Sequence, residues 1–97
     1  MANYIVLLRY TPQGAANIKQ GPARIEAARQ AFRSMGGELK SVYLVMGQYD
    51  AITFAEAPDD ETIAKICLAL GSQGNVRSET LRAFSEDEFK KIVAALP

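Results

Sequence analysis

Strand-like and helix-like segments alternate along this 97-residue chain, and their order leaves few folds open to it. Short β-branched and apolar runs that end at glycine, proline or aspartate predict strands. Apolar residues that recur every three or four positions predict amphipathic helices. Together these patterns predict a strand at 3–10, a helix that begins at Pro22, strands at 39–46 and 51–57 joined by a turn, a helix after 58–60, a strand at 75–84 and a helix after Ser85.

The ends of the predicted helices carry local signals of their own. Gly36-Gly37 provides a C-cap for the first helix, and Gly71 follows the second. Ser85 and Glu88 have the spacing of a capping box, in which the serine hydroxyl and the glutamate carboxylate each accept a hydrogen bond from the other's backbone amide. The last helix therefore has the clearest start of the three.

The chain order β-α-β-β-α-β-α defines the expected fold class. Its first six elements form the split β-α-β pattern of a ferredoxin-like sandwich with an antiparallel four-stranded sheet, and the seventh is an appended C-terminal helix. A chain of 97 residues allows a single core, and no linker or repeat divides it. We therefore predict one α+β domain over residues 1–97.

The predicted sheet is apolar on both of its faces. In the first strand Ile5 and Leu7 alternate with Val6 and Leu8, so both faces receive apolar side chains. In this fold the two central helices cover only one face. A second copy of the chain is the simplest cover for the other face, because an isologous dimer buries the same patch twice. We expect a homodimer or a higher even oligomer with a cavity between the sheets.

The composition argues against several classes of function. Lysine plus arginine number 11 and aspartate plus glutamate also number 11, so we expect neither nucleic acid nor a membrane as a partner. Histidine is absent and Cys67 is the only cysteine, so we expect no metal and no cofactor. The N-terminus shows no leader pattern, and no apolar run reaches the about 20 residues of a membrane helix. We therefore expect a cytoplasmic protein.

Several blocks of the chain resemble the GYD domain family. The turn Gly47-Gln48-Tyr49-Asp50 has the G-x-Y-D signature after which that family is named, and the segments 9–14, 70–77 and 80–84 look like further family blocks. The resemblance covers nearly the whole chain. It implies a ferredoxin-like domain of the dimeric α/β-barrel kind, found in small bacterial and archaeal proteins. Relatives of this architecture include cofactor-free monooxygenases, isomerases, decarboxylases and binding proteins.

Asp50 and Tyr49 are the candidates for catalysis. At the mouth of a cavity, Asp50 could act as a general base, while Tyr49 or Tyr43 donates a hydrogen bond to a developing oxyanion. The same tetrad is also good turn chemistry, because aspartate readily bonds to nearby backbone amides. The structural interpretation of Asp50 is the stronger of the two.

A second set of polar side chains lies mainly on the predicted strands, in or around the expected cavity. Arginine there offers a guanidinium to a carboxylate, so a small organic anion is the expected ligand. A structural ion pair, within the chain or between subunits, explains the same residues. Lys19, near the start of the helix at Pro22, offers a separate site for an anion. The predicted ligand-binding residues are Arg9, Lys19, Tyr43, Arg77 and Glu79.

Three functions follow from these observations. The favoured one is a homo-oligomeric binding or interaction module that holds a small organic ligand between its sheets and is not an enzyme. The first alternative is a cofactor-independent enzyme of the monooxygenase, isomerase or decarboxylase type, which uses Asp50 and Tyr49 with an arginine anchor. The second is a structural assembly protein with a packed cavity. They differ in whether the cavity is open and whether Asp50 and Arg9 face it.

Overall fold

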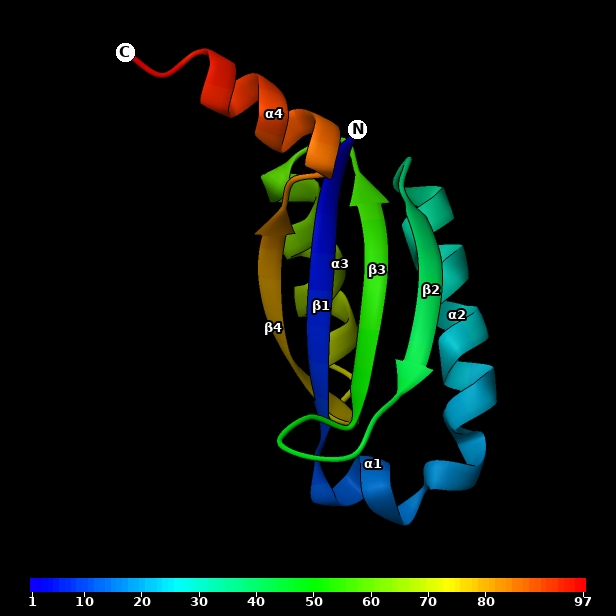
Figure 1. Ribbon diagram of the computed structural model, residues 1–97. Helices are drawn as coiled ribbons and strands as arrows, with labels where there is room; N and C mark the ends of the chain where they lie inside the picture. Colours follow the sequence, from blue (N-terminus) through cyan, green and yellow to red (C-terminus); the bar gives the residue numbers. More distant parts are fainter.

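The computed structural model describes residues 1–97 and contains one sheet with its long helices α2 and α3 on one side (Figure 1). The predicted order of strands and long helices is confirmed, and a short helical segment is added after the first strand. The elements are β1 (Ala2–Tyr10), α1 (Pro12–Ala16), the 3-10 helix η1 (Ile18–Gln20), α2 (Gly21–Ser34), β2 (Glu38–Leu44), β3 (Ala51–Ala57), α3 (Asp60–Gly71), β4 (Val76–Ala83) and α4 (Glu86–Ala94).

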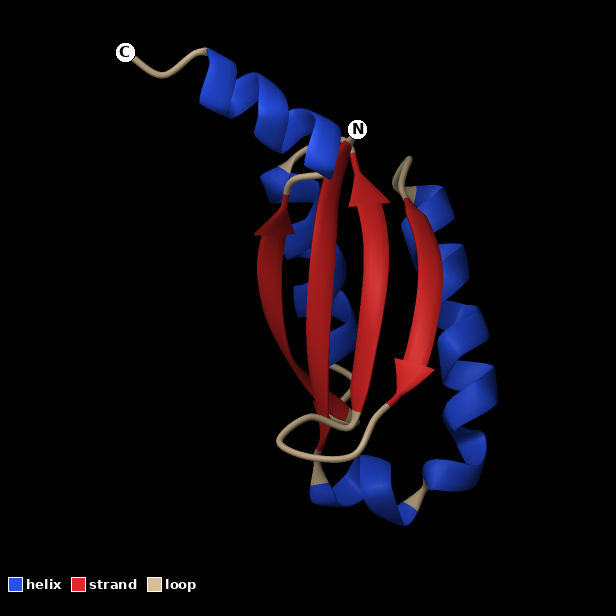
Figure 2. Ribbon diagram, in the orientation of Figure 1, coloured by secondary structure: helices blue, strands red, loops and turns tan.

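The sheet has the strand order β2-β3-β1-β4, and every neighbouring pair is antiparallel. β1 and β3 are therefore central. In the register of the sheet, Val6 lies opposite Thr53 on one side and opposite Thr80 on the other. Figure 2 shows α2 and α3 behind the strands, which leaves the front face of the sheet without a covering element. This is the predicted ferredoxin-like arrangement.

The core lies between the sheet and the two long helices. Alternate strand residues, among them Tyr4 and Val6, point towards Phe32 of α2 and towards Ile63 and Ile66 of α3. Small side chains on β3 let the helices approach the sheet closely. The residues of the buried cluster are Tyr4, Val6, Phe32, Leu39, Ala55, Ala57, Ile63 and Ile66.

The segment between β1 and α2 differs from the prediction. The sequence suggests a break after Tyr10, whereas the structure forms α1 and η1 there. The Thr11 hydroxyl caps α1 by accepting from the Gly14 amide at 3.0 Å and donates to the Gly74 carbonyl at 2.5 Å. The helical turn therefore depends on a partner some sixty residues away in the chain, which local patterns do not reveal.

The C-terminal helix α4 begins as predicted but does not pack on the domain. Both hydrogen bonds of the Ser85–Glu88 capping box are present. The Asn3 side-chain amide also donates to Glu88 at 3.1 Å, which ties the start of α4 to β1. Beyond that point the helix runs away from the sheet (Figure 1). The apolar side chains Phe89, Ile92 and Val93 of this helix, and Leu96 just after it, are exposed.

Candidate functional site

The open face of the sheet carries an apolar patch that no part of the chain covers. Phe54 and Leu81 flank Ile5 in register, and Tyr43 stands edge-on to the Phe54 ring at 6.2 Å between ring centroids. Phe54, Leu81 and Tyr43 are 41%, 42% and 57% exposed. Isolated apolar residues on a surface are ordinary, but a contiguous patch on a sheet indicates an interaction site. We call this surface the open face; its apolar members are Ile5, Leu7, Tyr43, Ile52, Phe54 and Leu81.

A polar cluster occupies one end of the open face and joins three of the predicted site residues. The Arg9 guanidinium lies over the Tyr49 ring, 4.6 Å from its centroid, and its Nε donates to the Gln48 carbonyl at 2.7 Å. The Tyr49 hydroxyl donates to Glu79 Oε1 at 3.0 Å. That hydrogen bond to a carboxylate raises the pKa of Tyr49. A tyrosine held protonated in this way acts as a hydrogen-bond donor.

Arg77 belongs to the same end of the open face. It lies directly opposite Arg9 in the β1–β4 register, which places two arginines and Glu79 on the same part of the face. The cluster of Arg9, Tyr49, Arg77 and Glu79 therefore has one cation in excess. Such an arrangement can accept a carboxylate or another small anion.

Asp50 stands apart from this cluster. Its Oδ2 accepts from the Tyr10 amide at 2.8 Å, and its own amide donates to the Leu8 carbonyl at 2.8 Å. Both bonds tie the β2–β3 turn to the end of β1. The carboxylate thus serves the backbone, in the way expected of a turn aspartate.

The remaining predicted residues are more dispersed. Tyr43 lies on the edge strand β2 beside Phe54, within the apolar part of the open face. Lys19 is an exposed residue of η1, outside the open face. The structure therefore brings four of the seven predicted residues together and leaves Asp50, Tyr43 and Lys19 in separate surroundings.

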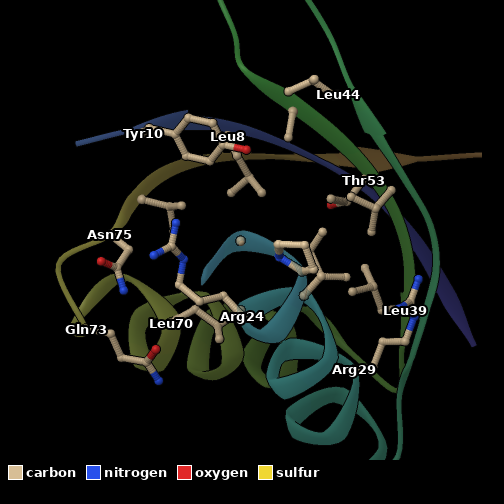
Figure 3. A pocket seen from close by; sticks show the side chains of 16 residues that line it. Leu8, Tyr10, Arg24, Arg29, Leu39, Leu44, Thr53, Leu70, Gln73 and Asn75 are labelled. Atoms are coloured by element: carbon tan, nitrogen blue, oxygen red, sulfur yellow. The ribbon is translucent and has the colours of Figure 1, made fainter. Parts of the chain in front are cut away.

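A pocket of about 430 Å³ lies on the other side of the sheet, beneath the N-terminal half of α2 (Figure 3). It is lined by Arg24 and Tyr10 together with apolar side chains of the sheet and both helices. Sequence reasoning missed this pocket, because the space depends on how α2 leans on the sheet. Small residues at positions 51 and 53 beneath the helix are the only local signal of it.

Two further features bear on chemistry. No cluster of three His, Cys, Asp or Glu side chains is arranged so that it could hold a metal ion. None of the helices combines the length and the apolar character that crossing a membrane requires.

The fold and the open face define a ferredoxin-like α+β domain with an uncovered sheet. A family model for the GYD domain matches residues 4–93, and the chain belongs to that family. Its sequence is 37% identical over 84 residues to the glutamine synthetase and cystathionine beta-lyase binding protein of Thermus thermophilus, covering 86% of this chain and 88% of that protein.

Solved structures show the same fold. A crystal structure of a Thermus thermophilus protein matches with a TM-score of 0.56 and 26% identity, over 88% of this chain and 95% of that one. A feast or famine regulatory protein from M. tuberculosis, in complex with L-methionine, matches with a TM-score of 0.67 and 14% identity. That match covers 88% of this chain and 51% of the regulator, so the chain spans about half the regulator's length.

Proposed function

We propose that this protein is a non-catalytic binding module that pairs with a second copy of itself through the open face. The uncovered apolar patch around Phe54 and Leu81 carries the proposal. Exposing apolar side chains to water is unfavourable, and a symmetric dimer buries the same patch on both copies. Only 12 of the 97 residues are buried in one chain, so the single domain has much apolar surface left to bury.

The dimensions of the open face suit such a dimer. Four strands spaced about 4.8 Å apart and seven residues long give a footprint of roughly 19 by 23 Å. The accessible area of standing side chains exceeds this footprint. The footprint, about 440 Å², is roughly half of the about 800 Å² per partner that a standard interface buries, and the exposed stripe of α4 can add to it.

The polar cluster supports a ligand role for the paired module. Arg9, Arg77, Tyr49 and Glu79 lie at one end of the open face, so a face-to-face pair encloses them at the edge of the interface. The excess cation there suits a small organic anion between the sheets. Asp50 and Tyr49 give less support to an enzyme, because the Asp50 carboxylate already accepts from the Tyr10 amide.

The Thermus relative favours a second candidate, in which the module binds a metabolic enzyme. Its name states that it binds glutamine synthetase and cystathionine beta-lyase. The exposed apolar stripe of α4 is the surface in this chain that would suit a protein partner. Binding of purified glutamine synthetase to the wild type, lost in an Ile92→Asp variant, would support this candidate.

Sedimentation velocity of two matched variants tests the pairing. Phe54→Asp places a charge in the middle of the open face and should convert the dimer to a monomer. Leu68→Asp places the same charge on α3 at an exposed position and should leave the dimer intact. Far-UV circular dichroism should show that both variants fold. A wild type that sediments as a monomer, or a Phe54→Asp variant that remains dimeric, would overturn the proposal.

A further inference from the structure

The pocket beneath α2 is independent of the open face, because it lies on the opposite side of the sheet. Its floor is formed by β1 and β3, its roof by α2 and one wall by the end of α3 (Figure 3). At about 430 Å³ its volume falls in the range of about 300 to 1,000 Å³ typical of small-molecule sites. Pairing through the open face would leave it accessible.

The pocket exists because small residues face each other across the sheet–helix interface. Ala51 and Thr53 present little volume on the floor, and Gly21 and Pro22 begin the helix above them. Nine of the sixteen lining residues are apolar. An unfilled apolar space of this size forfeits packing contacts, so a ligand with an apolar body would gain them. The apolar lining residues are Leu8, Pro22, Ile25, Leu39, Val42, Leu44, Ala51, Leu70 and Val76.

One side of the pocket is polar and positively charged. Figure 3 shows the Arg24 side chain on the same side as Tyr10, Gln73 and Asn75. Arg24 donates from Nη1 to the Asn17 carbonyl at 3.1 Å and from Nη2 to the Gly14 carbonyl at 3.2 Å. Two backbone carbonyls thus hold the guanidinium in place and leave further N–H donors on it free.

No carboxylate neutralises Arg24. The ion pairs of the chain involve other cations, and no aspartate or glutamate lines the pocket. Arg29, the other arginine of the lining, pairs with Glu26 at 3.4 Å. The side chain of Arg24 is therefore an oriented, half-buried cation without an acidic partner, at the edge of an apolar cavity.

We propose that this pocket binds a small monocarboxylic acid with an apolar body, such as a medium-chain or aromatic acid. The carboxylate accepts from the Arg24 guanidinium, with the Tyr10 hydroxyl nearby, and the apolar body lies along the wall that includes Leu8 and Ile25. The absence of an acidic side chain in the lining disfavours an amino acid, whose ammonium group would find no anionic partner there.

Isothermal titration with octanoate and its neutral counterpart octanamide tests this site. Wild-type protein should bind octanoate and should bind octanamide about tenfold more weakly or worse, because the amide lacks the charge that Arg24 recognises. R24Q should weaken octanoate binding by a similar factor. Equal binding of the two ligands, or no heat with octanoate at millimolar concentration, would overturn the proposal.

Two matched variants at the edge of the pocket provide an independent test, which remains valid if R24Q disturbs the fold. Leu44 lines the pocket and is 77% exposed, whereas Met46, two residues on, is 99% exposed and does not line it. L44E should reduce octanoate binding about tenfold by repelling the carboxylate, and M46E should not change it. Equal effects of L44E and M46E would contradict the proposal. Octanoate binding should persist in F54D, and its loss there would place the acid between the sheets instead.

Discussion

At the scale of single residues, Asp50 and Tyr49 are neighbours in the chain with different surroundings. Asp50 accepts from the Tyr10 amide and fixes the β2–β3 turn to the end of β1. Tyr49 bonds to Glu79 beneath the Arg9 guanidinium, on the open face. The Gly47–Asp50 turn therefore contains both a residue that anchors the backbone, Asp50, and a member of the polar cluster, Tyr49.

Replacing Asp50 tests its role as an anchor. Asp50→Ala removes the acceptor of the Tyr10 amide and should lower the free energy of unfolding by about 1.5 to 3 kcal/mol. Asp50→Asn keeps a side-chain oxygen that can accept and should cost less. Urea denaturation followed by circular dichroism measures both. An Asp50→Ala variant as stable as the wild type would contradict the structural role.

Tyr4 predicts how stability depends on pH. Burial, together with a hydrogen bond from its hydroxyl to Asp60 Oδ1 at 2.6 Å, raises the pKa of Tyr4 from 10.0 to about 12. A raised pKa in the folded state gives stability that is complete below pH 10 and is lost as the pH rises towards about 12. The stability advantage of the wild type over Tyr4→Phe should therefore shrink across this window. A difference that stays constant in alkaline urea titrations would contradict this assignment.

At the scale of elements, the packing of α1 against the loop before β4 sets the corner of the fold. Gly14 is buried there, and a Cβ added to it would lie 2.0 Å from the Asn75 carbonyl oxygen. The atoms that this Cβ would meet are backbone atoms of Asn75, which cannot move aside as a flexible side chain could. Only glycine therefore fits at position 14, where α1 lies against the backbone of Asn75.

Gly14→Ala should therefore destabilise the protein by about 1 to 3 kcal/mol, as overpacking does in other tight contacts. Gly71→Ala is the matched control, because a Cβ at Gly71, the last residue of α3, meets nothing within 4 Å. That variant should be neutral or slightly stabilising. Thermal denaturation of the two variants compares them directly, and equal midpoints would show that the Gly14 contact is not constrained.

The sequence alone predicts most of the elements, and the exceptions have physical reasons. The strands and the two long helices α2 and α3 follow from their own periodicity, and α4 follows from the Ser85–Glu88 pair. The turn α1 does not, since its Thr11 cap is completed by the Gly74 carbonyl. The Arg9–Tyr49–Glu79 cluster is anticipated only as a set of residue types, because strand register brings them together. The pocket beneath α2 depends on tertiary packing, and the small residues Ala51 and Thr53 are its only local signal.

At the scale of the whole molecule, the domain is a thin two-layer body. Its principal extents are 51 × 31 × 18 Å, and the longest includes α4, which projects from one end (Figure 1). One layer of helices leaves the open face and the stripe of α4 in water. Both surfaces expose apolar side chains, so a partner that covered them would add stability. A second copy would bury the open face without introducing a different protein.

Native mass spectrometry at low micromolar concentration tests this central claim most directly. The account predicts a species of about twice the 10.6 kDa chain mass, or a higher even multiple, that falls to the single-chain mass under denaturing conditions. The same spectra of Phe54→Asp should show one chain. A wild-type spectrum that contains only the single chain would contradict the claim that the open face is an interface between copies.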